Sequence, residues 1–296
     1  MGPKLDEKFD KRLIIYAAII IICIIAVGIG VYTQFFYKHG DDDPLGIGIG
    51  TGTTIDVNEE EEKEKQEKVK TGFDTLFINA LTYTSSNFNN SVRRKDASKD
   101  LVYTSNEYSK TVDGKYSMNI NVPEINVESV VANEINNSIG DTFVKKATSI
   151  LANADLITDY TIYNIDYTAC VNGDILSLLI RATLKEGSKP QRIMYLGYNY
   201  NLKTGTKITL QDYMEYKGIT EATLQNKINK EIEKMAQNTQ NLSSILGTSL
   251  YKRNTSDKMY KVENVNNYYY GADGYVYVIY AYGNSNYTSE TDIILF

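Results

Sequence analysis

The sequence has few of the residues that bind metals or cofactors. Its 296 residues include one histidine (His39), two cysteines (Cys23 and Cys170) and no tryptophan. Zinc, haem and iron–sulfur sites draw most of their ligands from histidine and cysteine. The motifs of phosphate-binding loops, zinc proteases, serine hydrolases and dithiol redox proteins are also missing. We therefore expect no cofactor, no metal and no catalysis by a histidine-based triad.

Basic residues are also in deficit. The formal net charge is −6, from 31 Lys and Arg against 37 Asp and Glu. A general nucleic-acid binder needs a basic surface for the phosphates, so we expect no nucleic-acid partner. The composition favours no particular oligomeric state.

One long stretch, residues 13–36, has no charge over 24 positions. A helix that rises 1.5 Å per residue crosses the hydrocarbon core of about 30 Å in about 20 residues. The stretch predicts a transmembrane helix. A cleaved signal peptide is the alternative, but the apolar run is longer than the usual one and no A-x-A site follows it.

Charges on the two sides of this stretch predict its orientation. Lys4, Lys8, Lys11 and Arg12 precede it, and residues 41–43 are all aspartate. The positive-inside rule then makes residues 1–12 a cytoplasmic tail. We expect a single-pass protein of the cell membrane with its C-terminal domain extracellular.

Residues 37–70 resemble a linker and a charged stalk. Residues 46–52 read GIGIGTG, which is typical of a flexible tether. Residues 59–70 read EEEEKEKQEKVK and contain favourable Glu-to-Lys pairs four positions apart, such as Glu64–Lys68. We expect a solvated helical stalk here.

The rest of the chain predicts an α+β fold, with an antiparallel sheet covered by two main amphipathic helices. Residues 71–155 form a first α+β subdomain, with an alternating strand at 116–122 closed by Pro123 and a helix over 127–150. Residues 156–296 form a C-terminal α+β domain. It contains a meander of strands at 160–168, 175–184 and 192–201, a helix with Leu224, Ile228 and Ile232, and strands at 275–282 and 293–296.

Tyrosine is the residue in excess, with 25 copies. Exposed tyrosines supply flat amphipathic contact area for sugars or protein partners. The candidate binding residues lie around the turn at 271–274 and are Tyr268, Tyr269, Tyr270, Tyr275 and Tyr277. The alternative is compositional bias together with burial of alternate tyrosines in the core.

Paired carboxylates need no histidine for hydrolysis. Asp159, Asp166, Asp174 and Glu186 are available for this chemistry, yet each falls beside a turn or on the polar face of a strand. We therefore assign no catalytic residue.

The order of elements resembles a known family. A strand ending in INVP at 120–123 precedes a helix with Glu134-Ile135-Asn136, and the meander ends in NLKTGTKITLQDY at 201–213. Over about residues 100–296 this resembles the RsiV-like extracytoplasmic domain family, which includes the ectodomain of a lysozyme-sensing anti-sigma factor and accessory domains of a peptidoglycan deacetylase. The resemblance implies an extracytoplasmic recognition domain beside the wall of a Gram-positive-type bacterium. It transfers no binding residue.

These observations favour a membrane-anchored domain that recognises a wall-associated protein or glycan without catalysis. Lysozyme is a candidate, although the chain lacks both a long cytoplasmic segment and a deacetylase domain with its metal-binding histidines. The alternatives are a carboxylate-dependent cell-wall hydrolase and a structural subunit of an envelope complex.

Overall fold

We describe the fold from a computed structural model. The structure describes residues 57–84, 92–153, 159–246, 250–283 and 289–296, which belong to one compact unit, Asp56–Phe296. The predicted tail, the transmembrane helix at 13–36 and the first part of the linker lie outside the described residues. Within the described ranges, no helix is both long and apolar enough to cross a bilayer.

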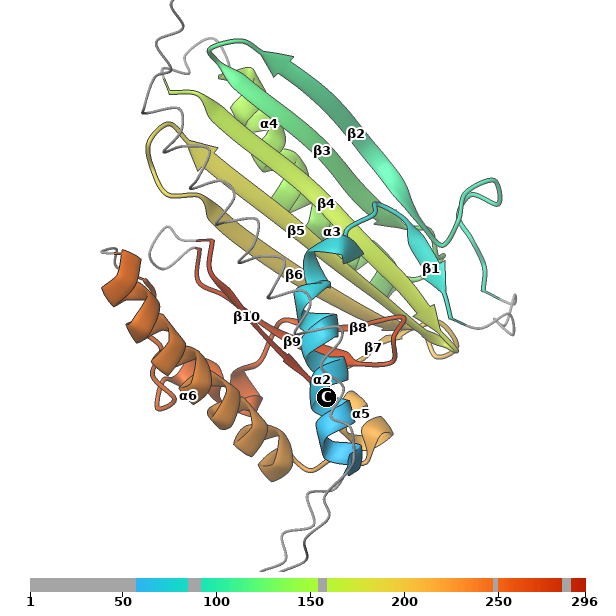
Figure 1. Cartoon of the computed structure of the whole chain (residues 1–296). Coiled ribbons are helices and arrows are strands. Elements are labelled where there is room, and N and C mark those ends of the chain that lie inside the picture. The colour runs from blue at the N-terminus through green and yellow to red at the C-terminus, as the bar shows by residue number, and fades with distance from the viewer. Residues whose placement is uncertain (1–56, 85–91, 154–158, 247–249, 284–288) are drawn as a thin grey trace, which may run out of the picture. The chain divides into compact units, whose positions relative to one another are not determined.

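A large sheet carries most of the fold (Figure 1). Its strand order is β2 (Val102–Val112), β3 (Tyr116–Ile125), β4 (Thr161–Asn172), β5 (Ile175–Glu186), β6 (Arg192–Asn201) and β7 (Thr206–Lys207), and β1 (Leu81–Tyr83) pairs with the end of β4. Pairing is antiparallel except at β3–β4 and β1–β4. The predicted meander is confirmed, and Gly173 and Gly187 take the positive φ angles that its two tight turns require.

Strand β3 runs past its predicted end at Pro123. Its alternate residues Tyr116, Met118, Ile120 and Val122 are buried, as the pattern predicted. Pro123 stays in the strand because β3 pairs with β4 only as far as Ile120, and because the facing strand β2 shifts register between Thr104 and Asn106. A proline without an N–H is tolerated at such an irregular, one-sided position.

The predicted helix at 127–150 is confirmed as three consecutive helical segments: α3 (Val130–Ile139), a π-helical segment (Gly140–Val144) and α4 (Lys145–Ala152). It begins after Ser129, whose side chain caps the amide of Ala132. Ile135, Ile139 and Phe143 pack into the core of the large sheet. The connection through this helix allows β3 and β4 to lie parallel, so the sheet runs across the predicted boundary at residue 155.

A second sheet has three antiparallel strands in the order β10 (Thr291–Leu295), β9 (Val276–Ala281) and β8 (Tyr268–Tyr270). The chain reaches it through α5 (Leu210–Lys217), which starts at the capping box predicted at Thr209 and Asp212, and through α6 (Glu221–Leu246). Leu224, Ile228 and Ile232 of α6 pack on this small sheet. The α+β class is therefore confirmed, and the two main helices cover two different sheets.

The charged segment forms the predicted helix, α2 (Val57–Thr71), with Lys68 and Glu64 paired at 2.9 Å. It is also bound to the folded part, which the prediction of a solvated stalk did not include. Lys70 pairs with Glu231 of α6 at 2.6 Å, and the hydroxyl of Tyr275 donates to Glu62 at 2.7 Å. Phe73, in the short 3-10 helix η1 (Phe73–Leu76), is buried against Tyr195 and Tyr277.

Candidate functional site

The candidate site lies where the edge of the large sheet meets the small sheet. At Gly197 of β6, a Cβ atom would lie 2.3 Å from the carbonyl oxygen of Tyr268, so only glycine permits this approach. The side chain of Asn267 takes the place of a neighbouring strand, because it accepts from the amide of Gly197 at 2.9 Å and donates to the carbonyl of Tyr195. Asn199 adds a bond from its amide to the carbonyl of Tyr268 at 3.0 Å.

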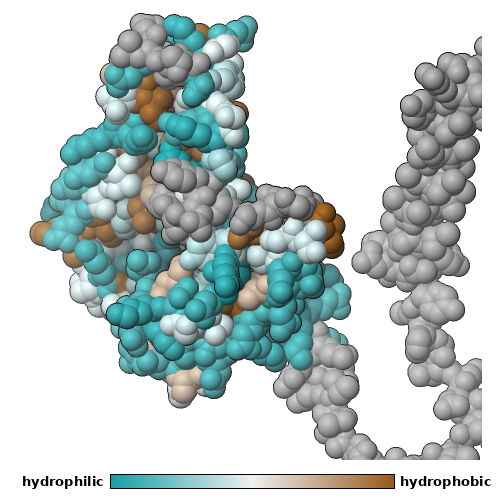
Figure 2. Space-filling view, turned by 90° about the vertical axis from the view of Figure 1, so that its left-hand side faces the viewer, coloured by the Kyte–Doolittle hydropathy of each residue, from teal (hydrophilic) through white to brown (hydrophobic). Residues whose placement is uncertain are grey.

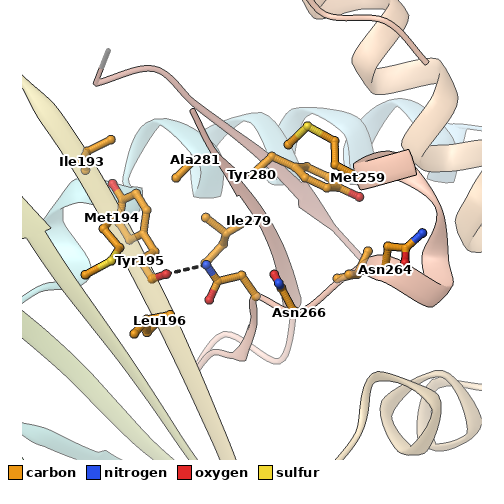
Figure 3. Close-up of a pocket in the computed structure, with 12 residues that line it drawn as sticks. Ile193, Met194, Tyr195, Leu196, Met259, Asn264, Asn266, Ile279, Tyr280 and Ala281 are labelled. Atoms are coloured by element: carbon orange, nitrogen blue, oxygen red, sulfur yellow. Dashed lines mark hydrogen bonds between the residues drawn. The ribbon is translucent and has the colours of Figure 1, made fainter. Parts of the chain in front are cut away.

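Next to this junction the two sheets diverge and leave a cavity of about 420 Å³ (Figure 3). One wall is β6 from Ile193 to Leu196, and the opposite wall is β9 from Ile279 to Ala281. Asn266 also lines the cavity, and Met259 and Asn264 come from the 3-10 helices η4 (Lys258–Tyr260) and η5 (Val262–Asn264). The lining residues that the structure describes have no charged side chain, so the cavity suits an uncharged ligand with both polar and apolar groups.

The wall formed by β6 has a further property. Its residues 192–196 pair with β5 on one side, while β7 pairs only with Tyr200 and Asn201 on the other. Among the described strands, none pairs with this part of the cavity-facing edge. Such an edge can accept an added extended strand through main-chain hydrogen bonds.

Tyr280 is the most unusual residue of the cavity. It is 5% exposed, its ring packs edge-on against Tyr260, and its hydroxyl has no hydrogen-bond partner among the described residues. Burial raises the pKa of Tyr280 well above that of a free tyrosine, so the hydroxyl stays protonated at neutral pH. A buried hydroxyl without a partner is costly, and a ligand with a donor or acceptor would satisfy it.

The prediction of an exposed tyrosine surface is wrong. Tyr269, Tyr270, Tyr275 and Tyr277 are 2%, 6%, 8% and 0% exposed, and Tyr268 is half-buried. The small sheet is covered on both faces: Tyr269, Tyr275 and Tyr277 face the large sheet and η1, and alternate residues of β9 face α6. Their hydroxyls donate hydrogen bonds inside the fold. For example, Tyr268 donates to the carbonyl of Ile208, and Tyr277 donates to the carboxylate of Asp273.

Two of the four carboxylates considered for hydrolysis, Asp166 and Glu186, are engaged in ion pairs between neighbouring strands of the large sheet. Asp166 contacts Arg181 at 3.5 Å, and Glu186 contacts Arg192 at 2.6 Å. Within the described residues, no three or more His, Cys, Asp and Glu side chains are grouped to hold a metal ion.

Sequence reasoning missed the cavity residues Tyr195, Asn266 and Asn267. The pair Asn266-Asn267 directly before three tyrosines was a signal, because asparagine side chains often replace main-chain partners at strand ends. The pairing of Asn267 with β6, about 70 positions earlier in the chain, has no local sequence signature.

Comparisons with known proteins add two distant structural neighbours. No family model and no curated protein match the chain. A DUF3298 family protein from Pseudomonas aeruginosa is 10% identical and has a TM-score of 0.34, with 65% of this chain and 85% of that one covered. A member of the DUF3298 family from Bacteroides fragilis is 10% identical with a TM-score of 0.32, and the match covers 66% of this chain and 89% of that one.

Proposed function

We propose that this chain is a single-pass, membrane-anchored extracytoplasmic domain that recognises a wall-associated protein without catalysis. The cavity between β6 and β9 receives an extended, uncharged segment of that protein. The observation that carries the proposal is a cavity whose described lining is uncharged and includes Tyr280, whose buried hydroxyl has no partner among the described residues. The predicted span at 13–36 holds the domain at the outer face of the bacterial membrane.

A protein segment fits this cavity better than a glycan. No described strand pairs with the outer side of β6 at residues 193–196, where Asn267 binds the Tyr195 carbonyl, and the other outward main-chain groups form an extended array that an added strand can match. Ile279, Met194 and Met259 supply apolar contacts for alternate side chains of that strand. A glycan would use the asparagines and Tyr280 but leave the strand edge without a partner.

The hydrolase and the structural-subunit readings find less support. Glu290 and Asp292, around the start of β10, are both bound by the buried Arg253, at 3.0 and 2.6 Å. This ion pairing does not favour a catalytic role for either carboxylate. Large exposed apolar side chains are spread over several elements, for example Val130 on α3 and Tyr216 on α5, and only Leu242 and Ile245 of those described lie together on one helix, α6. The face seen in Figure 2 is mainly hydrophilic, with apolar residues in separate spots.

The binding test uses the full chain in a neutral detergent and overlapping synthetic peptides from secreted lysozymes and other wall proteins. A second arm uses uncharged glycan-strand fragments. We expect at least one peptide to bind, and Tyr280→Phe to weaken that binding about tenfold through loss of one hydrogen bond to the ligand. Tyr216→Phe, on the exposed Tyr216 outside the cavity, is the matched control and leaves binding unchanged.

Binding of the glycans alone, or equal binding by wild type and Tyr280→Phe, would overturn the proposal for this cavity. The anchor is tested separately by adding a protease to intact cells stripped of their wall. The proposal expects loss of the C-terminal domain, and full protection of that domain contradicts it.

A further inference from the structure

A second hollow lies between α2 and α6, the helices drawn blue and orange in the lower half of Figure 1. This α2–α6 groove has a volume of about 830 Å³ and is lined only by polar side chains among the described residues. Five are lysines and three are glutamates, an excess of two positive charges in a chain whose net charge is −6. The lysines are Lys63 and Lys70 of α2 and Lys227, Lys230 and Lys234 of α6.

At the base of the groove, two lysines lie close enough for their ammonium groups to repel each other. Lys70 and Lys227 are both half-buried; Glu231 lies near both of them, and Glu62 also lies near Lys227. Lys227 also donates to the side-chain oxygen of Gln66 at 3.3 Å. Burial is the main cause that lowers the pKa of Lys227; the carboxylates of Glu231 and Glu62 raise it, and the neighbouring ammonium of Lys70 lowers it. An anion at this point would relieve the repulsion between the two ammonium groups.

Two of the three acids that line the groove already accept hydrogen bonds. Glu62 accepts from Tyr275 and Gln66, and Glu231 accepts from Lys70. Lys230 and Lys234 are exposed on the same side of α6 as Lys227, three and seven positions further along. The three lysines therefore extend over about 10 Å of helix, given a rise of 1.5 Å per residue.

We propose that the α2–α6 groove binds a chain that carries several phosphate groups. Lysine binds phosphate as a compact point charge that approaches from any direction, whereas carboxylates are matched best by the planar fork of arginine. The groove presents lysines and no arginine among its described lining, and it presents them from two facing walls. The row along α6 is too long for one phosphate, so successive phosphates of a chain occupy it.

The test measures binding of inorganic polyphosphate to the full chain in a neutral detergent by calorimetry. We expect binding that weakens as salt is raised, because lysine–phosphate contacts release counterions. The double substitution Lys230→Gln with Lys234→Gln lowers the affinity at least about tenfold, which corresponds to roughly 1.4 kcal/mol. Both side chains are exposed, so the variant keeps its fold, which circular dichroism checks.

Lys68→Gln is the matched control. It removes the same kind of charge from α2, but Lys68 pairs with Glu64 and does not line the groove. We expect less than about a twofold change. The proposal is overturned if polyphosphate does not bind, if Lys68→Gln weakens binding as much as the double variant, or if poly-glutamate of equal charge binds as tightly.

Discussion

At the scale of single residues, Gly197 decides whether the two sheets can meet. A Cβ atom there would lie 2.3 Å from the main-chain oxygen of Tyr268, and a main chain cannot rotate away as a flexible side chain can. We expect Gly197→Ala to lower the free energy of unfolding by about 3 kcal/mol or more, as overpacking does in a close-packed core. Urea denaturation measures it.

The control for this substitution is Gly140→Ala. Gly140 is helical, and an added Cβ would meet nothing within 4 Å. Alanine is the better helix former, so this variant should gain roughly 0.5–1 kcal/mol. Equal effects of the two substitutions would contradict the close approach at Gly197.

Removal of the hydroxyl should change the free energy of unfolding differently at two neighbouring tyrosines, Tyr280 and Tyr282. The hydroxyl of Tyr282 donates to Asp292 at 2.6 Å and lies 2.9 Å from that of Tyr260, whereas the hydroxyl of Tyr280 has no partner among the described residues. Without ligand, Tyr280→Phe should leave the free energy of unfolding unchanged or raise it by about 1 kcal/mol. Tyr282→Phe should lower it by about 1–3 kcal/mol, because Asp292 loses a donor. Thermal denaturation of both variants tests whether the hydroxyl of Tyr280 lacks a hydrogen-bond partner in the fold without ligand.

At the scale of elements, the carboxylate of Glu231 binds α2 to α6. Burial alone would raise the pKa of Glu231, but the hydrogen bond and charge of Lys70, with Lys234 and Lys227 nearby, outweigh it and lower the pKa. A lowered pKa means that the stabilisation is complete above the ordinary glutamate pKa, about 4.3, and is lost as the pH falls through the folded value.

We therefore expect α2 to lose its protection from hydrogen exchange in acid, below about pH 4, before the large sheet does. Glu231→Gln should remove this pH step, since glutamine cannot ionise. Glu64→Gln should retain the step, because Glu64 pairs with Lys68 on the exposed side of the helix. Uniform loss of protection in α2 and the large sheet would show that α2 is not a separate unit.

At the scale of the whole molecule, the stacking of layers explains why the tyrosines of the small sheet are buried. The helix pair α3–α4 covers one face of the large sheet, while the small sheet and η1 cover the other, and α6 covers the outer face of the small sheet. The strands of the small sheet are thus buried on both faces, and their aromatic side chains fill the space between layers.

This arrangement predicts unfolding in alkali. Burial raises the pKa of many tyrosines, including Tyr163 to about 12 and also Tyr213, Tyr269 and Tyr277. A raised pKa contributes full stability below the ordinary tyrosine value of about 10. That stability is lost as the pH rises further, because the unfolded chain ionises first. We expect tyrosinate absorbance to rise in step with loss of circular dichroism above about pH 10. Ionisation of these tyrosines near pH 10 in an intact fold would contradict the burial.

Local patterns determined most of the secondary structure. Alternation marked the buried face of β3, a four-residue spacing marked the stripe of α3 and α4, and Thr209 with Asp212 marked the start of α5. Each of these features depends on residues within a few positions of one another, which is why the sequence by itself was sufficient.

The tertiary structure alone decided what the faces contact. Alternation in residues 275–282 indicates which tyrosines share a face, but it does not say that a helix covers one face and a second sheet covers the other. Likewise, the charges of α2 predict a helix but not the pair between Lys70 and Glu231, which are 161 positions apart. The cavity, its strand edge and the α2–α6 groove all arise from such distant contacts, because burial and charge pairing depend on proximity in space and not along the chain.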